Sequence, residues 1–267
     1  MDNVLKKIIN KKKKKIKKYK KEYSISKIDE NIKSIKNFID FKSKIHQRTM
    51  DKKISIIAEI KKASPSAGII IDKFDVLEIA NTYVKNGASF LSVLTEEDFF
   101  LGKLDSIKNI KKIHNIPILC KDFFIDTYQV SLAKSFGADC ILIILSAVDK
   151  KLAEDLYQAA NDLNISTLIE VHSQKEAEIA LTFEKSIIGI NNRNLKTLDI
   201  SLDTSIELAK ILKPHKYPLV SESGIYSPKD IKNLFKNARI NNFLIGESLL
   251  KSSNIGSKLR DFSQINL

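Results

Sequence analysis

A pattern that repeats eight times between residues 54 and 247 constrains the fold of this chain more than any other feature. Each repeat has a short run of β-branched or apolar residues, then a polar cluster, then a longer helical stretch. Such alternation is typical of parallel βα units. The eight apolar runs span residues 54–61, 90–95, 116–123, 140–145, 166–172, 186–193, 217–223 and 242–246.

Eight such units are what a closed (β/α)8 TIM barrel requires. An open doubly wound sheet more often has five or six strands and a glycine-rich first turn, and this chain contains no GxGxxG or P-loop motif. Gly87 and Gly137 fall where a left-handed helix cap is expected. We therefore predict an α/β TIM barrel with helices near residues 76–86, 126–136, 150–163, 174–183, 201–212 and 228–237.

The net charge of +13 is concentrated at the N-terminus, where residues 1–22 contain eleven lysines and two acidic residues. Apolar residues and tyrosines recur through this segment at near-helical spacing, which predicts an amphipathic helix with a solvated basic face. The alternative is a basic RNA-binding arm. The segment lacks arginine and the usual aromatic interleaving of such arms, so we expect no specific nucleic-acid partner.

Apolar stretches are too short for a membrane span, which needs roughly 18 consecutive apolar residues. The lysine-rich N-terminus has no apolar signal region. We expect a soluble cytoplasmic protein with no membrane partner. A monomer is the expected state, with a weak homodimer as the alternative.

Cysteines and histidines give no support for a metal site. Cys120 and Cys140 lie in apolar runs without CxxC or paired Cys/His spacing, and the four histidines are scattered along the chain. We expect buried, reduced thiols, no metal and metal-independent chemistry.

Ionisable residues stand at the ends of the predicted strands, where barrel enzymes carry their chemistry. Because strand side chains alternate, residues two positions apart share a face. Unpaired charges are costly to bury in apolar strands, so these groups indicate either an active site or a structural ion-pair network. The same-face pairs are Glu59 with Lys61, Glu170 with His172, and Asn191 with Arg193, and further end residues are Lys121 and Glu222.

Small residues after three strands suggest a phosphate site. Ser223 and Gly224 follow the seventh strand, and Gly246 and Glu247 follow the eighth, where barrels commonly bind phosphate on backbone N–H groups. Ser64, after the first strand, could add a hydroxyl group. Turn glycines without any ligand are the alternative for each position.

Seven segments together resemble the indoleglycerol phosphate synthase family, in the order and strand spacing of that family. They are AEIKKASPS (58–66), SVLTE (92–96), PILCKDF (117–123), LIEVH (168–172), GINNRNL (189–195), SESGI (221–225) and LIGESL (244–249). The resemblance implies an N-terminal helical extension over residues 1–48 and a barrel catalytic domain over residues 49–267.

The resemblance also implies an activity: ring closure, decarboxylation and dehydration of 1-(2-carboxyphenylamino)-1-deoxyribulose 5-phosphate to indole-3-glycerol phosphate, without a cofactor. A lysine ammonium desolvated among apolar strands could supply a proton near neutral pH. Lys121 resembles the family's acid for ring closure. Lys61 and Glu170 match the acid and base of the dehydration, and Glu59 resembles a residue that orients Lys61.

Further residues match the family's substrate-binding positions. Asn191 and Glu222 resemble residues that hold the sugar hydroxyls and the anthranilate group. Arg193 either supports Asn191 or pairs with the substrate carboxylate. The phosphate would lie on Ser64, Ser223, Gly224, Gly246 and the backbone of Glu247, and the ring between Phe100, Phe123, Leu195 and Ile245, although core packing is an equal interpretation for Ile245.

Two other barrel enzymes that bind sugar phosphates are the nearest alternatives: phosphoribosylanthranilate isomerase and the tryptophan synthase α subunit. Neither needs Glu59 and Lys61 together with Lys121. The small-molecule partner expected in every case is a phosphorylated substrate. We expect His172 to be a structural histidine, because the acid and base set is complete without it.

Overall fold

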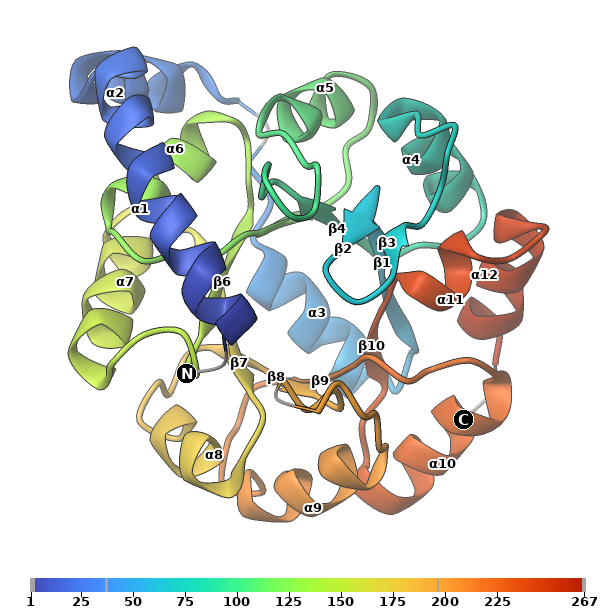
Figure 1. Cartoon of the computed structure of the whole chain (residues 1–267). Helices are drawn as coiled ribbons and strands as arrows, with labels where there is room; N and C mark the ends of the chain where they lie inside the picture. Colours follow the sequence, from blue (N-terminus) through green and yellow to red (C-terminus); the bar gives the residue numbers. More distant parts are fainter. Residues whose placement is uncertain (1–2, 37, 196, 266–267) are drawn as a thin grey trace.

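The computed structural model describes residues 3–36, 38–195 and 197–265. Within them, eight parallel strands form a closed barrel in the order β1-β10-β9-β8-β7-β6-β5-β4 (Figure 1). This confirms the predicted TIM barrel. The barrel strands are β1 (Ser55–Ile60), β4 (Phe90–Leu94), β5 (Ile118–Lys121), β6 (Cys140–Ile144), β7 (Ser166–Val171), β8 (Ile187–Asn191), β9 (Leu219–Glu222) and β10 (Asn242–Ile245).

Helices surround the barrel on its outside (Figure 1). All six predicted helices are present, and Gly87 and Gly137 have the expected positive φ of 100° and 94°. The helix α5 was not predicted, although its buried Ile107 and Ile110 recur at helical spacing. The outer helices are α4 (Val76–Lys85), α5 (Asp105–Ile113), α6 (Tyr128–Ser135), α7 (Lys150–Asp162), α8 (Gln174–Ala180), α9 (Asp203–Ile211), α10 (Pro228–Ala238), α11 (Glu247–Leu250) and α12 (Ile255–Ser263).

Strand alternation divides the core into two layers and aims the polar residues inward. Alternate residues such as Ile56 and Ala58 pack against the outer helices. Ile57, Leu119 and Leu168 belong to the cluster inside the barrel. A side chain two residues after an inward apolar one also points inward. This places Glu59, Lys121 and Glu170 above the inner cluster, together with Glu222, which follows the inward Val220.

Helix α3 (Phe41–Met50) closes the amino-terminal end of the barrel. Its Phe41 and Ile45 belong to the inner cluster, and the ring centroids of Phe41 and Phe90 lie 4.5 Å apart. The helix contacts β1 and β7. The expected boundary between residues 48 and 49 falls inside α3, which itself packs on the barrel.

Helix α1 (Asn3–Glu22) lies across the opposite end of the barrel, in front of the opening in Figure 1. The predicted amphipathic helix is confirmed over its described residues, since the buried positions include Leu5, Ile8, Ile9, Ile16 and Tyr19. Residues 1–2 of the lysine-rich segment, and residues 266–267 of the expected barrel domain, lie outside the described residues. Helix α2 (Ile25–Ser34) then packs on α6.

A short hairpin in the first βα loop was not expected. It pairs β2 (Ala63–Ser64) with β3 (Gly68–Ile69) in antiparallel fashion. Among the described residues, no helix is long and apolar enough to cross a membrane.

Candidate active site

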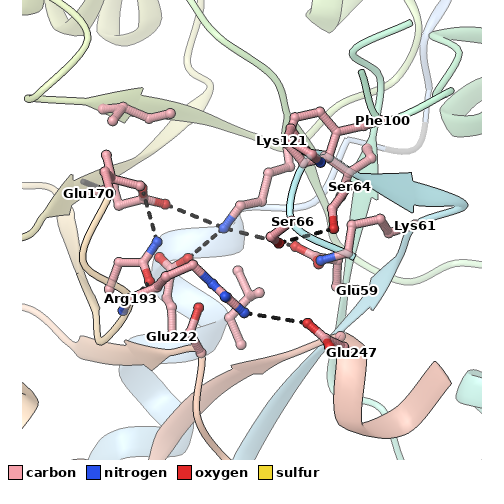
Figure 2. Close-up of a pocket in the computed structure, with 18 of the residues that line it drawn as sticks. Glu59, Lys61, Ser64, Ser66, Phe100, Lys121, Glu170, Arg193, Glu222 and Glu247 are labelled. Atoms are coloured by element: carbon pink, nitrogen blue, oxygen red, sulfur yellow. Dashed lines mark hydrogen bonds and ion pairs between the residues drawn. The ribbon is translucent and has the colours of Figure 1, made fainter. Parts of the chain in front are cut away.

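One cavity of about 400 Å3 at the carboxyl ends of the strands brings together every residue singled out for catalysis or substrate binding (Figure 2). The cavity is lined by Glu59, Lys61, Ser64, Phe100, Lys121, Phe123, Glu170, Asn191, Arg193, Leu195, Glu222, Ser223, Gly224, Ile245, Gly246 and Glu247.

Lys121 lies at the centre of this cavity among three carboxylates from three other strands. Its Nζ is 2.5 Å from Glu222 Oε2, 3.4 Å from Glu170 Oε2 and 4.0 Å from Glu59 Oε2. Burial lowers the pKa of Lys121, but the three carboxylates outweigh burial and raise the pKa well above its usual range. The ammonium group is therefore held in its charged form.

This result corrects one expectation. Desolvation was expected to make a buried lysine acidic near neutral pH, but Lys121 is buried together with its counter-ions. Opposite charges within about 4–6 Å favour the protonated amine more strongly than burial disfavours it. Lys121 is therefore a charged hydrogen-bond donor with a firmly held proton.

The pKa of Glu222 is also raised, but for a carboxyl group this shift favours the neutral form. Burial and the nearby charges of Glu170 and Glu59 outweigh Lys121 and raise the pKa of Glu222 to about 7. Its Oε1 is buried and has no hydrogen-bond partner among the described residues. A Cβ at Gly189 would lie 2.2 Å from that oxygen, so glycine leaves room for the carboxylate. Glu222 therefore contacts Lys121 through Oε2, while Oε1 lies against Gly189.

Glu59 and Lys61 form the second pair of the site. Lys61 Nζ donates to Glu59 Oε1 at 2.5 Å. Burial raises the pKa of Glu59, but Lys61 and Lys121 outweigh burial and lower it. A Cβ at Gly246 would lie 2.5 Å from Glu59 Oε1. The absence of a side chain at Gly246 therefore lets the last βα loop approach this pair.

Asn191 links Glu170 to the loop after β8. Its Nδ2 donates to Glu170 Oε1 at 3.3 Å, and the backbone N–H of Arg193 donates to its Oδ1 at 3.0 Å. The Arg193 guanidinium group lies 3.4 Å from Glu247 Oε2. Arg193 therefore supports Asn191 through its backbone, while its guanidinium group faces the Glu247 carboxylate.

His172 lies beside the cavity but does not line it. Nε2 is 3.2 Å from Glu170 Oε1, within ion-pair distance, although its orientation does not satisfy hydrogen-bond geometry. Nδ1 is 3.4 Å from Glu176 Oε2. Burial lowers the pKa of His172, but the two glutamates outweigh burial and raise it to about 9. The geometry agrees with a charged structural residue behind Glu170.

The expected phosphate loops meet on one side of the cavity (Figure 2). Ser64 Oγ accepts a hydrogen bond from the backbone N–H of Ala67 at 3.2 Å. Ser223 and Gly224 both have positive φ, 66° and 79°. The Glu247 carboxylate is 2.6 Å from Lys251 Nζ in addition to its contact with Arg193. These cations partly offset the negative charge of Glu247 near the loops.

Some residues of the apolar wall of the cavity were predicted from the sequence, and others were not. Phe100 and Phe123 face one another with ring centroids 6.2 Å apart. Ile245 lines the cavity and also packs in the outer core, so its core packing is confirmed and a contact with the substrate ring stays a prediction. The missed lining residues include Val4, Leu5 and Ile8 of α1, Leu142 and Ile144 of β6, and Tyr226. The apolar stripe of α1 was visible, but not the surface it covers.

A closed parallel barrel whose lysines and glutamates converge at the carboxyl ends of its strands defines an enzyme of the (β/α)8-barrel class. Solved structures share this fold at low sequence identity. One is the tryptophan synthase α subunit from Legionella pneumophila, with a TM-score of 0.60, 14% identity, and coverage of 89% of this chain and 97% of that one. Such identity supports the fold alone.

Sequence comparison identifies the family. The family model described as indole-3-glycerol phosphate synthase matches residues 5–262, so this chain belongs to that family. The indole-3-glycerol phosphate synthase of Alkaliphilus metalliredigens is 43% identical over 258 residues, 97% of each chain. That of Carboxydothermus hydrogenoformans is 44% identical over 207 residues, 78% of each chain.

Proposed function

We propose that this chain converts 1-(2-carboxyphenylamino)-1-deoxyribulose 5-phosphate to indole-3-glycerol phosphate, with loss of carbon dioxide and water. It is thus a carboxy-lyase of tryptophan biosynthesis. The observation that carries the proposal is the position of Lys121 Nζ among Glu222, Glu170 and Glu59, in a cavity walled by two phenylalanine rings. Family membership supplies the substrate.

Ring closure is the first step. The ring carbon that bears the carboxylate attacks the sugar ketone, a carbon–carbon bond forms, and the electron pair of the carbonyl π bond moves to oxygen. Lys121 donates its proton to this developing alkoxide. The donor must be charged beforehand, and the surrounding carboxylates ensure this by raising the pKa of Lys121. Protonation of Glu222 removes one of these charges and makes the transfer easier.

Decarboxylation follows from the substrate's own electronics. Closure leaves a cation conjugated with the nitrogen, and the carbon–carboxylate bond breaks with its electron pair moving into the ring. Carbon dioxide leaves and the cation is neutralised. The protein contributes a dry, apolar wall beside the reacting ring, because apolar surroundings favour the loss of charge.

Dehydration completes the indole. Lys61 donates a proton to the leaving hydroxyl, and Glu170 removes a proton from the ring system. The contact of Lys61 with Glu59 orients the donor, and the contact of Asn191 with Glu170 orients the base. The two catalytic groups come from different strands, so they can act on different atoms of one bound substrate.

Substrate orientation follows from the shape of the cavity. The phosphate binds to Ser64 and the backbone of the loops that carry Ser223, Gly224, Gly246 and Glu247. The aromatic ring lies between Phe100 and Phe123, with Leu195 and Ile245 around it. Asn191 and Glu222 hold the sugar hydroxyls and the anthranilate group, and Arg193 supports Asn191 through its backbone N–H.

A monomer in the cytoplasm completes the proposal. Cys120 and Cys140 are both buried free thiols, as expected in a reducing compartment. Sedimentation at micromolar concentration measures the oligomeric state, and a stable dimer would contradict the monomer.

The direct experiment mixes purified protein with the substrate and records indoleglycerol phosphate fluorescence. We expect time-dependent product formation that is first order in enzyme. Phosphoribosylanthranilate, the substrate of the isomerase that was the nearest alternative, serves as the control. Turnover of this control without any indole product would overturn the proposed function.

A further inference from the structure

One lysine of α1 differs from the others in being buried. The side chain of Lys12 is 1% exposed, and its Nζ lies 2.6 Å from Asp122 Oδ1, in a carboxylate that is itself 8% exposed. The next residue, Lys13, is exposed. Burying an amine costs several kcal/mol unless an opposite charge compensates. The position of Lys12 beside Asp122 is therefore constrained by the fold.

The two carboxylates beneath α1 organise the loops that carry the aromatic wall. Asp122 accepts a hydrogen bond from the backbone N–H of Phe123 at 2.7 Å. Glu96 is 1% exposed, and its Oε2 accepts from the backbone N–H groups of Phe99 at 2.7 Å and Phe100 at 3.1 Å. Both rings of the wall therefore stand on backbone held by a buried carboxylate.

Lys12 is the direct counter-ion of Asp122, and the charge of Glu96 also acts on it. Burial lowers the pKa of Lys12, but Asp122 and then Glu96 outweigh burial and raise it. Without this cation, two buried negative charges would remain beside a cavity that must accept a carboxylate and a phosphate. Unpaired buried charges destabilise a site and repel an anion.

We propose that Lys12 is a positioning residue for substrate binding, which holds the loops of Phe100 and Phe123 in the spacing that accepts the anthranilate ring. This inference rests on the proposed function. The Lys12–Asp122 contact also holds α1 in the position in which Val4, Leu5 and Ile8 complete the apolar wall. Lys12 touches no reacting atom and acts through Asp122 and Glu96.

The test compares Lys12→Met with Lys13→Met, the same substitution at the adjacent exposed position. For Lys12→Met we expect KM for the substrate to rise roughly tenfold, with kcat changed less than about threefold, because the loss is one of ring positioning. The competitive inhibition constant of inorganic phosphate should stay within about twofold, since phosphate contacts different loops. Lys13→Met should match the wild type in all three quantities.

A merely structural role would give a different result. Loosening of the whole mouth would raise the phosphate inhibition constant together with KM, and this outcome overturns the proposal. Unchanged KM in folded Lys12→Met overturns it as well. If Lys12→Met fails to fold, Glu96→Gln tests the arrangement from the other side with α1 intact, and the same rise of KM without a change in phosphate inhibition is expected.

Hydrogen exchange separates failure of this inference from failure of the proposed function. Backbone amides of Phe99, Phe100 and Phe123 should exchange at least about tenfold faster in Lys12→Met than in Lys13→Met, because their acceptors lose their counter-ion. This measurement needs no turnover. Equal exchange rates refute the positioning role, whereas absence of indole product from the wild type refutes the proposed activity.

Discussion

Lys121 and Glu222 share a hydrogen bond in which each partner alters the proton affinity of the other. The amine is surrounded by carboxylates from β1, β7 and β9, and its pKa rises. The carboxyl group is buried near two other acids, and its pKa rises to about 7 despite the lysine. At neutral pH Lys121 therefore keeps its proton, and Glu222 is the member of the pair that titrates.

Lys121→Ala should lower kcat by at least about a hundredfold, the usual scale for removing a general acid. The fold should survive, because the barrel is held by its apolar layers, as thermal unfolding and circular dichroism can verify. Product fluorescence measures the rate. Lys108→Ala, on the outer helix α5, is the matched control and should keep wild-type turnover. Near-normal turnover of Lys121→Ala would reject Lys121 as the acid.

Glu222→Gln should change the pH dependence of stability. The pKa of Glu222 in the folded state, about 7, lies above its ordinary value of 4.5. The folded state therefore binds more protons than the unfolded state between these values, and the stability contributed by Glu222 falls as pH rises through that window. Glutamine cannot ionise and avoids this loss.

Thermal unfolding at pH 5 and pH 8 measures this effect. The Tm of Glu222→Gln relative to wild type should increase from pH 5 to pH 8, by the equivalent of about 2–3 kcal/mol. Glu207→Gln, an exposed glutamate of α9, should show no such trend. A parallel pH dependence in Glu222→Gln and wild type would show that Glu222 does not carry this ionisation.

Among the elements, the loops after β1, β9 and β10 carry the proposed phosphate contacts, and each has a local constraint. The β2–β3 hairpin fixes Ser64, and positive φ shapes the turn at Ser223 and Gly224. Gly246 is restricted because a Cβ there would contact Glu59. A bulky residue at Gly246 would disturb the Glu59–Lys61 pair as well as the phosphate, so it cannot isolate phosphate binding.

Ser64→Ala is the cleaner test of the phosphate site. The change removes a hydroxyl group without adding volume, so KM and the inhibition constant of inorganic phosphate should both rise roughly tenfold while kcat changes little. Steady-state kinetics with phosphate as competitor measure both constants. Ser131→Ala on α6 serves as control. Unchanged values in Ser64→Ala would place the phosphate elsewhere in the cavity.

At the scale of the whole molecule, helices close both ends of the barrel. Helix α3 closes the amino-terminal end, and α1 lies across the mouth. The lysines of α1 are partly used in this docking, since Lys11 lies 3.6 Å from Asp98, Lys20 lies 2.6 Å from Asp126, and Lys15 contacts Glu97. The basic segment and the acidic loops after β4 and β5 are thus complementary.

Deletion of residues 1–22 should lower both activity and stability. It exposes the apolar surface beneath α1, removes one wall of the cavity and leaves Asp122 without its cation. We expect kcat/KM to fall at least about a hundredfold and Tm to fall by several degrees, since excluding water and orienting substrate both depend on the closed mouth. Kinetics and calorimetry measure these quantities.

The same variant addresses the RNA-binding alternative. Full-length protein should bind RNA only weakly, with an affinity that falls steeply as salt increases. A tight, sequence-dependent RNA complex that requires residues 1–22, together with unaffected turnover in the deletion variant, would favour the alternative over a role in closing the active site.

The sequence by itself determined the barrel fold and which strand-end residues line its cavity. Periodicity of apolar runs reports local structure directly, and strand alternation places Glu59, Lys121, Glu170 and Glu222 above inward apolar residues. These four residues line one cavity as a consequence, whereas loop residues such as Phe100 and Leu195 were predicted from the family resemblance. The short hairpin was missed because its apolar signal is brief, whereas α5 was not named although Ile107, Ile110 and Ile113 recur at helical spacing.

Only the tertiary structure decided the proton affinities and the place of α1. The pKa of Lys121 depends on three carboxylates that lie far away along the chain, so no local pattern could reveal that it rises rather than falls. Likewise, a lysine within a lysine-rich helix looks the same whether solvated or buried. Lys12 is buried because α1 docks on acidic loops after β4 and β5, and that contact exists only once the chain has folded.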